Sequence, residues 1–455
     1  MDLDKLHRIY FLGIGGIGMS ALARYFHRRG AEVSGYDKTS TRLTNQLLGE
    51  GIDVHFEDDP DKVMNNPDLV IYTPAVPQDL GEFELIRTKG FPLKKRSEVL
   101  GQLSKDKKTI AVAGTHGKTT VSSMIAHILH NSSVGCNAFI GGIMKNYDSN
   151  LIVSPDADFM VVEADEFDKS FLQLNPTISM VTSMDADHLD IYGDYESMQN
   201  NFRQFVSQTK ADGAAVVKKG INLDISENYR PISYSLKEKA AFYAENIRVH
   251  DGKYEFDLHT NSNQTVKIRL GVPGLINVEN AVAASAVALT AGVGIKELVM
   301  TLATFTGIKR RFDHIIQTDD LIYIDDYAHH PEEINGLISS LRHMYPGKKM
   351  VGIFQPHLYS RTRHLADGFA SSLDQLDEVI LLPIYPAREK PIAGVESEMI
   401  LRLMKNPKSE VSSKKDLIKN LENKDFDILL TIGAGDIDEL VEPVANYLRT
   451  EKATL

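Results

Sequence analysis

Short apolar runs occur throughout the chain, and each is bounded by glycine or polar residues, as are strands buried in parallel sheets. In the first region, strands are predicted at residues 9–12, 33–37 and 69–73. Ile17, Ala21, Leu22 and Phe26 follow the first of these runs at helical spacing. Strands that alternate with helices in this way predict a parallel sheet with helices on its faces.

The same alternation returns twice further along the chain. Strands are predicted at residues 109–113, 159–163 and 178–182 in a second region, and at 321–325, 351–354, 379–382 and 428–432 in a third. Between about 230 and 270 the pattern changes to short alternating strands such as 254–258, which predict antiparallel strands added to the second region. An Ala- and Val-rich helix is predicted at about 278–291, and the polar run 104–108 predicts a linker.

Composition narrows the class of protein. The chain has 455 residues, of which 42% are hydrophobic and 25% charged, as is usual for a soluble globular protein. No run approaches the ~20 apolar residues that span a bilayer, and the acidic N-terminus is unlike a secretory signal. A net charge of −12 argues against nucleic-acid binding, and the single cysteine excludes a disulfide framework. We therefore expect a cytoplasmic enzyme with neither a membrane nor a nucleic-acid partner.

The strongest chemical signal is a phosphate-binding loop directly between an apolar strand and a helix. Small loop residues let backbone N–H groups surround phosphate oxygens, and the helix N-terminus attracts anions. Lys118 can reach the β- and γ-phosphates of ATP, and the Thr119 hydroxyl can ligate Mg²⁺. Val112 stands where the standard pattern has glycine, and the alternative is a glycine-rich turn with an exposed lysine. The predicted ATP-binding residues of this loop are Gly114, Thr115, His116, Gly117, Lys118, Thr119 and Thr120.

Two further residues are candidate metal ligands beside Thr119. Glu163 ends the apolar run 159–162, and His188 lies just past the strand that ends at residue 182. Ligands collect at the carboxyl ends of strands in open α/β sheets, so both side chains are placed to meet a Mg²⁺-nucleotide. Taken singly, an acidic strand end and a capping histidine are the alternatives.

Six segments, in this order along the chain, together resemble the Mur ligase family. They are residues 114–120, 163–166, 187–190, 277–280, 310–313 and 325–331. The resemblance implies a three-domain enzyme that uses ATP to join an amino acid to the carboxylate of a UDP-sugar in peptidoglycan synthesis, and hence in cell-wall biogenesis, cell shape and cell division. It implies a Rossmann-like UDP-sugar-binding domain at 1–105, a central P-loop ATPase-type domain that binds ATP at 106–312, and a Rossmann-like amino-acid-binding domain at 313–455.

The resemblance also implies roles for individual residues. Lys118 would hold the ATP phosphates, and His188 would bind a second Mg²⁺ between ATP and the sugar carboxylate. Asn277 and Asn280 resemble the adenine-side residues, although Ile276 stands where the family usually has histidine. Arg311 and Asp326 resemble the residues that the third domain of the family closes onto ATP.

A second glycine loop lies at residues 13–18, where G-x-G-x-x-G follows a strand and Asp37 ends the next strand. Alone, this pattern predicts an NAD site and favours an NAD-dependent dehydrogenase, which would leave the loop at 114–120 unexplained. In the family that this chain resembles, the equivalent loop holds UDP. The resemblance therefore implies UDP-sugar binding by Gly13, Gly15, Gly16, Ile17, Gly18 and Asp37.

The segment 354–362 resembles the amino-acid site in the branch of the family that joins L-alanine to UDP-N-acetylmuramate through an acyl phosphate. Arg361 would pair with the alanine carboxylate as a third catalytic residue beside Lys118 and His188, because guanidinium and carboxylate form a bidentate match. Tyr327 and His357 would frame the pocket. Some relatives carry a second arginine where this chain has Leu358. A branch that attaches a preformed tripeptide to the same sugar is the alternative, and a monomer or weak homodimer is expected.

Overall fold

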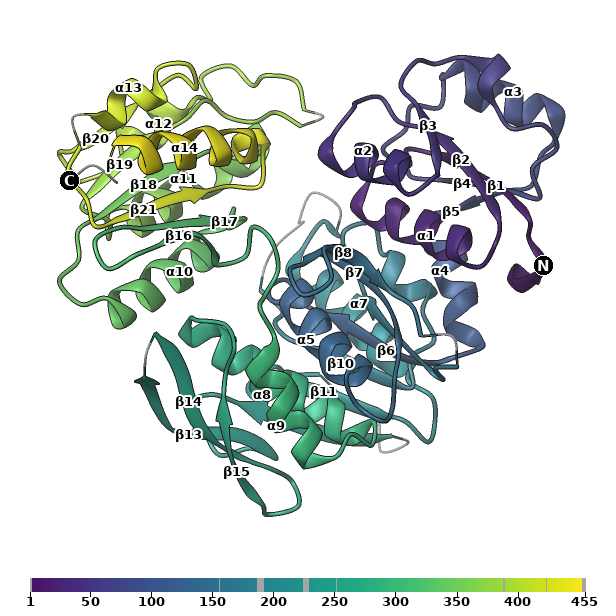
Figure 1. Cartoon of the computed structure of the whole chain (residues 1–455), viewed down its shortest axis with the longest axis horizontal. Coiled ribbons are helices and arrows are strands. Elements are labelled where there is room, and N and C mark those ends of the chain that lie inside the picture. The colour runs from purple at the N-terminus through teal and green to yellow at the C-terminus, as the bar shows by residue number, and fades with distance from the viewer. Residues whose placement is uncertain are drawn as a thin grey trace. The chain divides into compact units, whose positions relative to one another are not determined.

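The computed structural model describes residues 2–154, 156–185, 192–223, 229–250, 252–387, 389–422 and 424–451, without the side chains of residues 4 and 451. The chain forms two compact units. Unit 1 comprises Met1–Arg248, Glu255–Gly271 and Val278–Thr306, and unit 2 comprises Val249–Tyr254, Val272–Asn277 and Gly307–Leu455. Figure 1 traces the chain through the three sheets on which these units are built.

The first sheet of unit 1 is parallel, with the order β3-β2-β1-β4-β5. Its strands are β1 (Arg8–Leu12), β2 (Glu32–Tyr36), β3 (Asp53–His55), β4 (Leu69–Tyr72) and β5 (Leu93–Lys95). Its helices are α1 (Ile17–Arg28), α2 (Arg42–Gly49), α3 (Gly81–Lys89) and α4 (Arg96–Lys105), with the 3-10 turns η1 (Leu3–Lys5) and η2 (Pro60–Lys62). Strand order reverses beside β1, so the glycine loop after β1 lies at the switch point where ligands bind in such sheets. The predicted parallel sheet is confirmed.

The second sheet of unit 1 follows the order β15-β14-β13-β12-β11-β10-β6-β9-β7-β8. Its strands are β6 (Lys108–Ala113), β7 (Asn137–Met144), β8 (Ser149–Ile152), β9 (Phe159–Glu163), β10 (Ile178–Val181), β11 (Ala214–Lys218), β12 (Arg230–Ser235), β13 (Phe242–His250), β14 (Lys253–His259) and β15 (Thr265–Arg269). Its helices are α5 (Lys118–His130), α7 (Tyr195–Ser207), α8 (Leu275–Thr290) and α9 (Ile295–Thr304), with η3 (Ser170–Gln173). Because β6 lies between β9 and β10, the loop after β6 meets the carboxyl ends of both neighbours.

Two predictions for this region need correction. Antiparallel pairing is confirmed for β14 and β15, but β12 pairs parallel with β11, and β13 begins parallel to β12. The predicted linker at 104–108 is wrong for most of its length. Helix α4 continues to Lys105 and β6 begins at Lys108, so only residues 106 and 107 connect them. Ser104 is buried and donates a hydrogen bond to the Gly101 carbonyl, which keeps this polar residue inside the helix.

The two sheets of unit 1 share one hydrophobic cluster that includes Leu22 and Phe26 of α1 and Phe139 of β7. A buried polar network crosses the same boundary. Arg24 of α1 is 1% exposed, and its guanidinium donates hydrogen bonds to Glu50 and, at 2.6 Å, to the Asn150 side chain of β8. A buried guanidinium is costly unless paired, so these contacts fix α1 against β8.

Unit 2 is built on a sheet with the order β16-β17-β21-β18-β19-β20, in which β16 is antiparallel to β17 and the other pairs are parallel. Its strands are β16 (Asp313–Gln317), β17 (Ile322–Asp326), β18 (Met350–Phe354), β19 (Glu378–Leu381), β20 (Ser409–Val411) and β21 (Ile428–Ile432). Its helices are α10 (Pro331–Met344), α11 (Tyr359–Leu373), α12 (Ser397–Leu401), α13 (Leu417–Glu422) and α14 (Val441–Glu451), with η4 (Asp436–Leu440). Hydrophobic clusters cover both faces of this sheet, as predicted for a doubly wound region.

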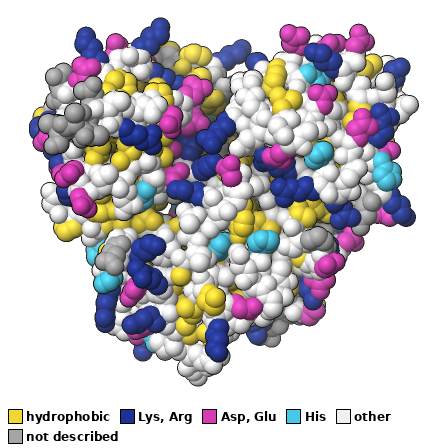
Figure 2. Space-filling view, in the orientation of Figure 1, with side chains coloured by type: hydrophobic (Ala, Val, Ile, Leu, Met, Phe, Trp, Pro, Cys, Tyr) yellow, Lys and Arg dark blue, Asp and Glu magenta, His cyan; other side chains and the backbone are white. Residues whose placement is uncertain are grey.

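Among the described residues, no helix is both long and apolar enough to cross a bilayer. Basic and acidic side chains are interspersed across the face of the molecule drawn in Figure 2.

Candidate active site

The predicted phosphate loop connects β6 to α5 and takes a backbone shape that requires glycine. Gly114 has φ 137° and Gly117 has φ 82°, both in the region that L side chains rarely adopt. A Cβ atom on Gly114 would lie 2.1 Å from the Thr182 hydroxyl oxygen. The loop is therefore packed closely against the carboxyl end of β10, and its shape does not tolerate a side chain at residue 114.

Residues that follow β10 hold the loop, and sequence analysis missed them. The Thr182 hydroxyl donates to the His116 carbonyl at 2.5 Å, and the His116 amide donates to the Ser183 hydroxyl at 2.7 Å. The Thr115 and Ser183 hydroxyls lie 2.9 Å apart. Two polar residues directly after a buried strand were the available signal, but only the pairing of β6 with β10 shows what they contact.

The lysine of the loop lies in an acidic setting, with 15% of its side chain exposed. Lys118 Nζ donates to the Gly114 carbonyl at 2.7 Å and to Glu166 Oε1 at 2.8 Å. Burial disfavours the charged form of Lys118, but Glu166 and the neighbouring carboxylates outweigh it and raise the lysine pKa. Glu166 is 1% exposed, and its Oε2 atom has no hydrogen-bond partner among the described residues. The lysine is therefore charged and held at the loop, as phosphate binding requires.

Thr119 and Glu163, two predicted metal ligands, are in contact. The Thr119 hydroxyl donates to Glu163 Oε1 at 2.8 Å, and the Gly141 amide of β7 donates to Glu163 Oε2 at 2.9 Å. A hydroxyl and a carboxylate are hard oxygen donors, so this pair fits Mg²⁺. His188, the third predicted ligand, lies outside the described residues. The described part of the chain holds no group of three or more His, Cys, Asp or Glu side chains arranged for a metal ion.

Of the two predicted adenine-side residues, Asn280 lies against the loop. A Cβ on Gly117 would lie 3.3 Å from Asn280 Oδ1. Asn277 stands one helical turn earlier on α8, and its amide donates to the Pro273 carbonyl at 2.6 Å. Ile276, at the position where the family usually has histidine, is 44% exposed. An exposed isoleucine offers an apolar surface here in place of a polar ring.

The loop at residues 13–18 is shaped by close packing around its glycines. Gly13 has φ 84°, and a Cβ on Gly15 would lie 2.6 Å from Thr44 Cγ2. Asp37 accepts a hydrogen bond from the Gly15 amide at 2.8 Å, so this carboxylate braces the loop. Ile17 and Gly18 open helix α1, whose N-cap Gly16 provides no side-chain cap. Unpaired N–H groups at a helix N-terminus favour an anion such as a diphosphate.

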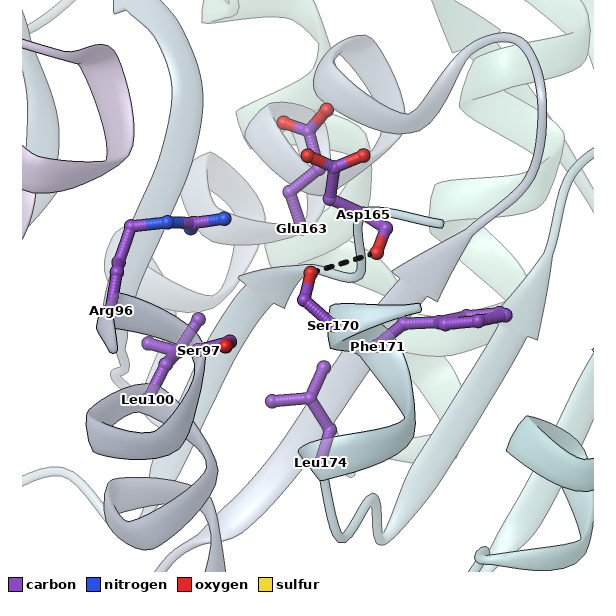
Figure 3. Close-up of a pocket in the computed structure, with 8 residues that line it drawn as sticks. All are labelled: Arg96, Ser97, Leu100, Glu163, Asp165, Ser170, Phe171 and Leu174. Atoms are coloured by element: carbon purple, nitrogen blue, oxygen red, sulfur yellow. Dashed lines mark hydrogen bonds between the residues drawn. The ribbon is translucent and has the colours of Figure 1, made fainter. Parts of the chain in front are cut away.

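A small cavity lies between α4, η3 and the end of β9, and Figure 3 shows the side chains around it. Its volume is about 10 Å³, room for one water molecule. The lining residues are Arg96, Ser97, Leu100, Glu163, Asp165, Ser170, Phe171 and Leu174. Arg96 was not predicted to have a role, yet it faces the carboxylates of Glu163 and Asp165 across this cavity.

Unit 2 brings the two predicted ATP-side residues of the third region together. Asp326 accepts hydrogen bonds from the Phe312 amide at 2.7 Å and from the Ala328 amide at 2.8 Å. Burial raises the pKa of Asp326 to about 6, while the nearby Arg311 opposes this shift. The Arg311 guanidinium lies 4.8 Å from the centre of the Tyr327 ring. Arg311, Asp326 and Tyr327 therefore belong to one cluster.

Arg310 has a structural part in this cluster that sequence analysis missed. Its guanidinium lies 3.3 Å from Asp325 and donates to the Gly433 carbonyl at 2.7 Å. Asp325 is 1% exposed and also accepts from the Thr431 hydroxyl at 2.7 Å. The first arginine of the pair thus ties β17 to the end of β21, which leaves Arg311 as the predicted ligand-binding member.

The predicted amino-acid residues form a chain of contacts in the same unit. Arg361 Nη1 lies 3.4 Å from His357 Nδ1. His357 stacks on Tyr385 with ring centres 5.7 Å apart, and its ring lies 6.1 Å from that of His329. His329 in turn contacts Tyr327 at 5.4 Å. Tyr327, His357 and Arg361 are therefore neighbours, and His329 and Tyr385 are members of the cluster that sequence analysis missed.

Electrostatics distinguish His329 from an ordinary surface histidine. Burial lowers the pKa of His329 to about 4, although Glu333 opposes the shift. The His329 amide donates to Glu333 at 2.9 Å, which fixes the backbone beside Tyr327. Leu358 has φ 68°, and its amide donates to the Tyr385 carbonyl at 2.9 Å. This strained residue aims His357 and the first turn of α11 in the observed directions.

A phosphate loop with a partly buried lysine and an adjacent threonine–carboxylate pair defines the chain as a P-loop nucleotide-binding enzyme. Three domain models of one family match it. They are the Mur ligase family catalytic domain at residues 8–108, the Mur ligase middle domain at 112–288 and the Mur ligase glutamate ligase domain at 310–435. The chain belongs to the Mur ligase family and is a ligase that uses ATP.

Similar proteins include two relatives described as UDP-N-acetylmuramate–L-alanine ligase. The one from Parabacteroides distasonis is 49% identical over 98% of both chains. The one from Porphyromonas gingivalis is 48% identical and covers 98% of this chain and 100% of its own. The crystal structure of UDP-N-acetylmuramate–alanine ligase from Thermotoga maritima has a TM-score of 0.83 at 28% identity, over 98% and 100% of the two chains. A murein peptide ligase from Psychrobacter arcticus has a TM-score of 0.70 at 23% identity, over 97% and 98%, and shares the fold.

Proposed function

We propose that this chain joins L-alanine to the lactyl carboxylate of UDP-N-acetylmuramate, forming UDP-N-acetylmuramoyl-L-alanine, ADP and phosphate. The observation that carries this proposal is the near-half identity, over almost the full length, to relatives described as catalysing this ligation. The partly buried Lys118 beside Thr119 and Glu163 supports it, because such a site suits transfer of the γ-phosphoryl group of ATP. We place the reaction in the cytoplasm, where ATP and the nucleotide sugar are available.

The chemistry takes two steps. A carboxylate oxygen of the sugar attacks the γ-phosphorus of ATP, and the bond to the bridging oxygen breaks to release ADP. The alanine ammonium first loses a proton, and the neutral amine attacks the carbonyl carbon of the acyl phosphate. The bond between that carbon and the phosphate oxygen breaks, phosphate leaves, and the nitrogen releases a second proton to give the amide. Lys118 offsets the repulsion between a carboxylate and a triphosphate, both of which are negatively charged. One Mg²⁺ ion held by Thr119 and Glu163, and a second held by His188, would neutralise further charge on the phosphates.

Unit 2 supplies the candidate alanine site. Arg361 carries a charge that suits the alanine carboxylate, and its contact with His357 restricts where the guanidinium can point. The rings of Tyr327 and His329 contact each other in the same cluster. A single arginine framed by aromatic side chains suits the carboxylate of one small amino acid, which favours alanine over a tripeptide. Arg311 and Asp326 remain the candidates for contact with ATP.

The test compares two acceptors with the purified chain. UDP-N-acetylmuramate, ATP and Mg²⁺ are incubated with either L-alanine or the cell-wall tripeptide, and product mass is measured together with phosphate release. We expect UDP-N-acetylmuramoyl-L-alanine and one phosphate for each product formed. Product with the tripeptide alone would replace the proposal by the tripeptide-adding alternative, and no product with either acceptor would refute both.

A further inference from the structure

Arg96 is the first residue of α4 and lies where the first sheet of unit 1 gives way to the second. Its side chain is half-buried and makes no hydrogen bond or ion pair with any residue that the structure describes. A guanidinium is always charged and has five N–H donors in a planar fork. Leaving such a group partly desolvated without an acceptor is costly, which points to an anionic ligand.

One side of Arg96 is covered by the glycine loop. A Cβ on Gly18 would lie 2.8 Å from Arg96 Nη1 and 3.2 Å from the carbon of the guanidinium. The guanidinium is therefore in contact with the first turn of α1, where the N-terminal N–H groups already favour an anion. Two sources of positive potential converge at this place.

The other side of Arg96 faces the acidic end of β9. Arg96 lines the same small cavity as Glu163 and Asp165, and its side chain points toward them in Figure 3. The cavity has room for about one water molecule, so in this structure it is not itself the place of a substrate group. Arg96 thus lies between the loop at residues 13–18 and the carboxylate that contacts Thr119.

The charges of the side chains around the loop at residues 13–18 indicate which anion Arg96 binds. Residues 13–18 contain no basic side chain, and Asp37 adds a negative charge beside them. The side chains nearest the loop glycines are Thr73, Val76, Asp37, Thr44, Met19 and Arg96. Arg96 alone among these is cationic. A nucleotide diphosphate carries two negative charges, so it requires this cation more than a single carboxylate does.

We propose that Arg96 binds the diphosphate of UDP-N-acetylmuramate at the glycine loop. This inference rests on the proposed function for its ligand. Arg96 would hold the diphosphate at the N-terminal end of α4. It would thereby anchor the sugar on the side of the loop that faces Glu163. The residue therefore contributes to substrate binding and, through it, to placing the lactyl carboxylate near the ATP phosphates.

The experiment measures binding by isothermal titration calorimetry without ATP, so that catalysis does not enter. Wild type, Arg96→Gln, Arg96→Lys and Arg28→Gln are titrated with UDP-N-acetylmuramate and UDP, and uridine is measured by competition. Arg28 is the matched control, because it is an exposed arginine at the opposite end of α1. We expect Arg96→Gln to weaken both diphosphate ligands roughly 10- to 100-fold, the usual factor for a lost hydrogen bond to a charged group.

The remaining results decide between a ligand contact and a structural role. We expect Arg96→Lys to recover part of the affinity, uridine binding to change less than threefold, and Arg28→Gln to match wild type. In steady-state assays, Arg96→Gln should raise the KM for UDP-N-acetylmuramate more than it lowers kcat. Equal weakening of uridine and UDP would indicate that Arg96 only shapes the loop and would overturn the inference, as would unchanged UDP affinity. If Arg96→Gln does not fold, Arg96→Lys against wild type decides in the same way.

Failure of the proposed function gives a different pattern. If wild type binds neither UDP-N-acetylmuramate nor UDP, the proposed substrate is wrong and the inference falls with it. If wild type binds both ligands and Arg96→Gln binds them equally well, the proposed function stands and only the role of Arg96 is refuted.

Discussion

Replacing Gly141 with alanine tests the metal site without substituting a proposed ligand. Gly141 is an exposed residue of β7 whose amide donates to Glu163 Oε2 at 2.9 Å. Its φ is not positive, so alanine fits the backbone itself. A Cβ at this position would lie 2.3 Å from Oε2 and 2.8 Å from the carboxyl carbon. The three atoms nearest to the added methyl group therefore all belong to the Glu163 carboxylate.

The size of the effect follows from these distances. Ordinary contact begins near 3.4 Å, so the carboxylate must move by about 1 Å (3.4 Å minus 2.3 Å). Glu163 is partly exposed and can rotate toward water, so the free energy of unfolding should change by less than about 1 kcal/mol. A displacement of ~1 Å at reacting groups can reduce a rate about 100-fold. We therefore expect a loss of activity of roughly 10- to 100-fold with little loss of stability.

The assay measures phosphate release across a Mg²⁺ titration and, separately, Mn²⁺ binding in the presence of ADP by electron paramagnetic resonance. Gly141→Ala should need more Mg²⁺ for half-maximal rate and should bind Mn²⁺ more weakly. Gly49→Ala is the matched control, because nothing lies within 4 Å of its added Cβ. Wild-type metal dependence in Gly141→Ala would remove Glu163 from the metal site.

Two further predictions concern other candidate site groups, and a third concerns His127, a buried residue of α5. Lys118→Ala should abolish turnover, while its affinity for UDP-N-acetylmuramate, measured by calorimetry, should stay within about twofold of wild type. An equal loss of that affinity would show that the roles of the two glycine loops are misassigned. Arg361→Lys should raise the KM for alanine at least ~10-fold more than that for ATP in steady-state assays, because an ammonium cannot form the bidentate pair, and a larger effect on ATP would contradict this. Burial lowers the pKa of His127 from 6.5 to about 4, so its unfolded form binds more protons between these values and stability must fall as the pH drops from 6.5 toward 4. Urea unfolding at pH 7 and pH 4.5 should show wild type losing up to ~2–3 kcal/mol more than His127→Gln, and equal losses would refute the assignment.

The sequence was enough to predict most strands, because burial on both faces leaves unbroken apolar runs. The predicted runs at 159–163 and 428–432 coincide with β9 and β21, and the other predicted strands differ by one residue at one or both ends. Direction was harder to predict. Strand β12 has the alternating texture of an antiparallel strand, yet it pairs parallel with β11. Alternation reports how many faces of a strand are buried, whereas direction depends on the path of the chain between strands.

The candidate site shows a similar division. Lys118, Thr119 and Glu163 were predicted because a strand, a loop and a helix place them by local rules. The residues that hold the loop and the Glu163 carboxylate in place were not predicted. Gly141 and Ser183 contact partners that are 22 and 67 residues away in the sequence. A hydrogen bond between such distant positions follows only from the order of strands in the sheet.

Arg96 illustrates why such contacts matter for function. The proposed reaction must bring a carboxylate to a triphosphate, and both groups are negatively charged, so the sugar has to be anchored by a part of itself that does not react. The diphosphate is that part, and binding energy gained there can position the lactyl carboxylate without stabilising it in the ground state. An arginine in contact with Gly18 and facing Glu163 across a cavity of about 10 Å³ meets this need. Across this small cavity the Arg96 guanidinium faces the Glu163 and Asp165 carboxylates without forming an ion pair with either. The positive charge of Arg96 therefore remains available to the substrate.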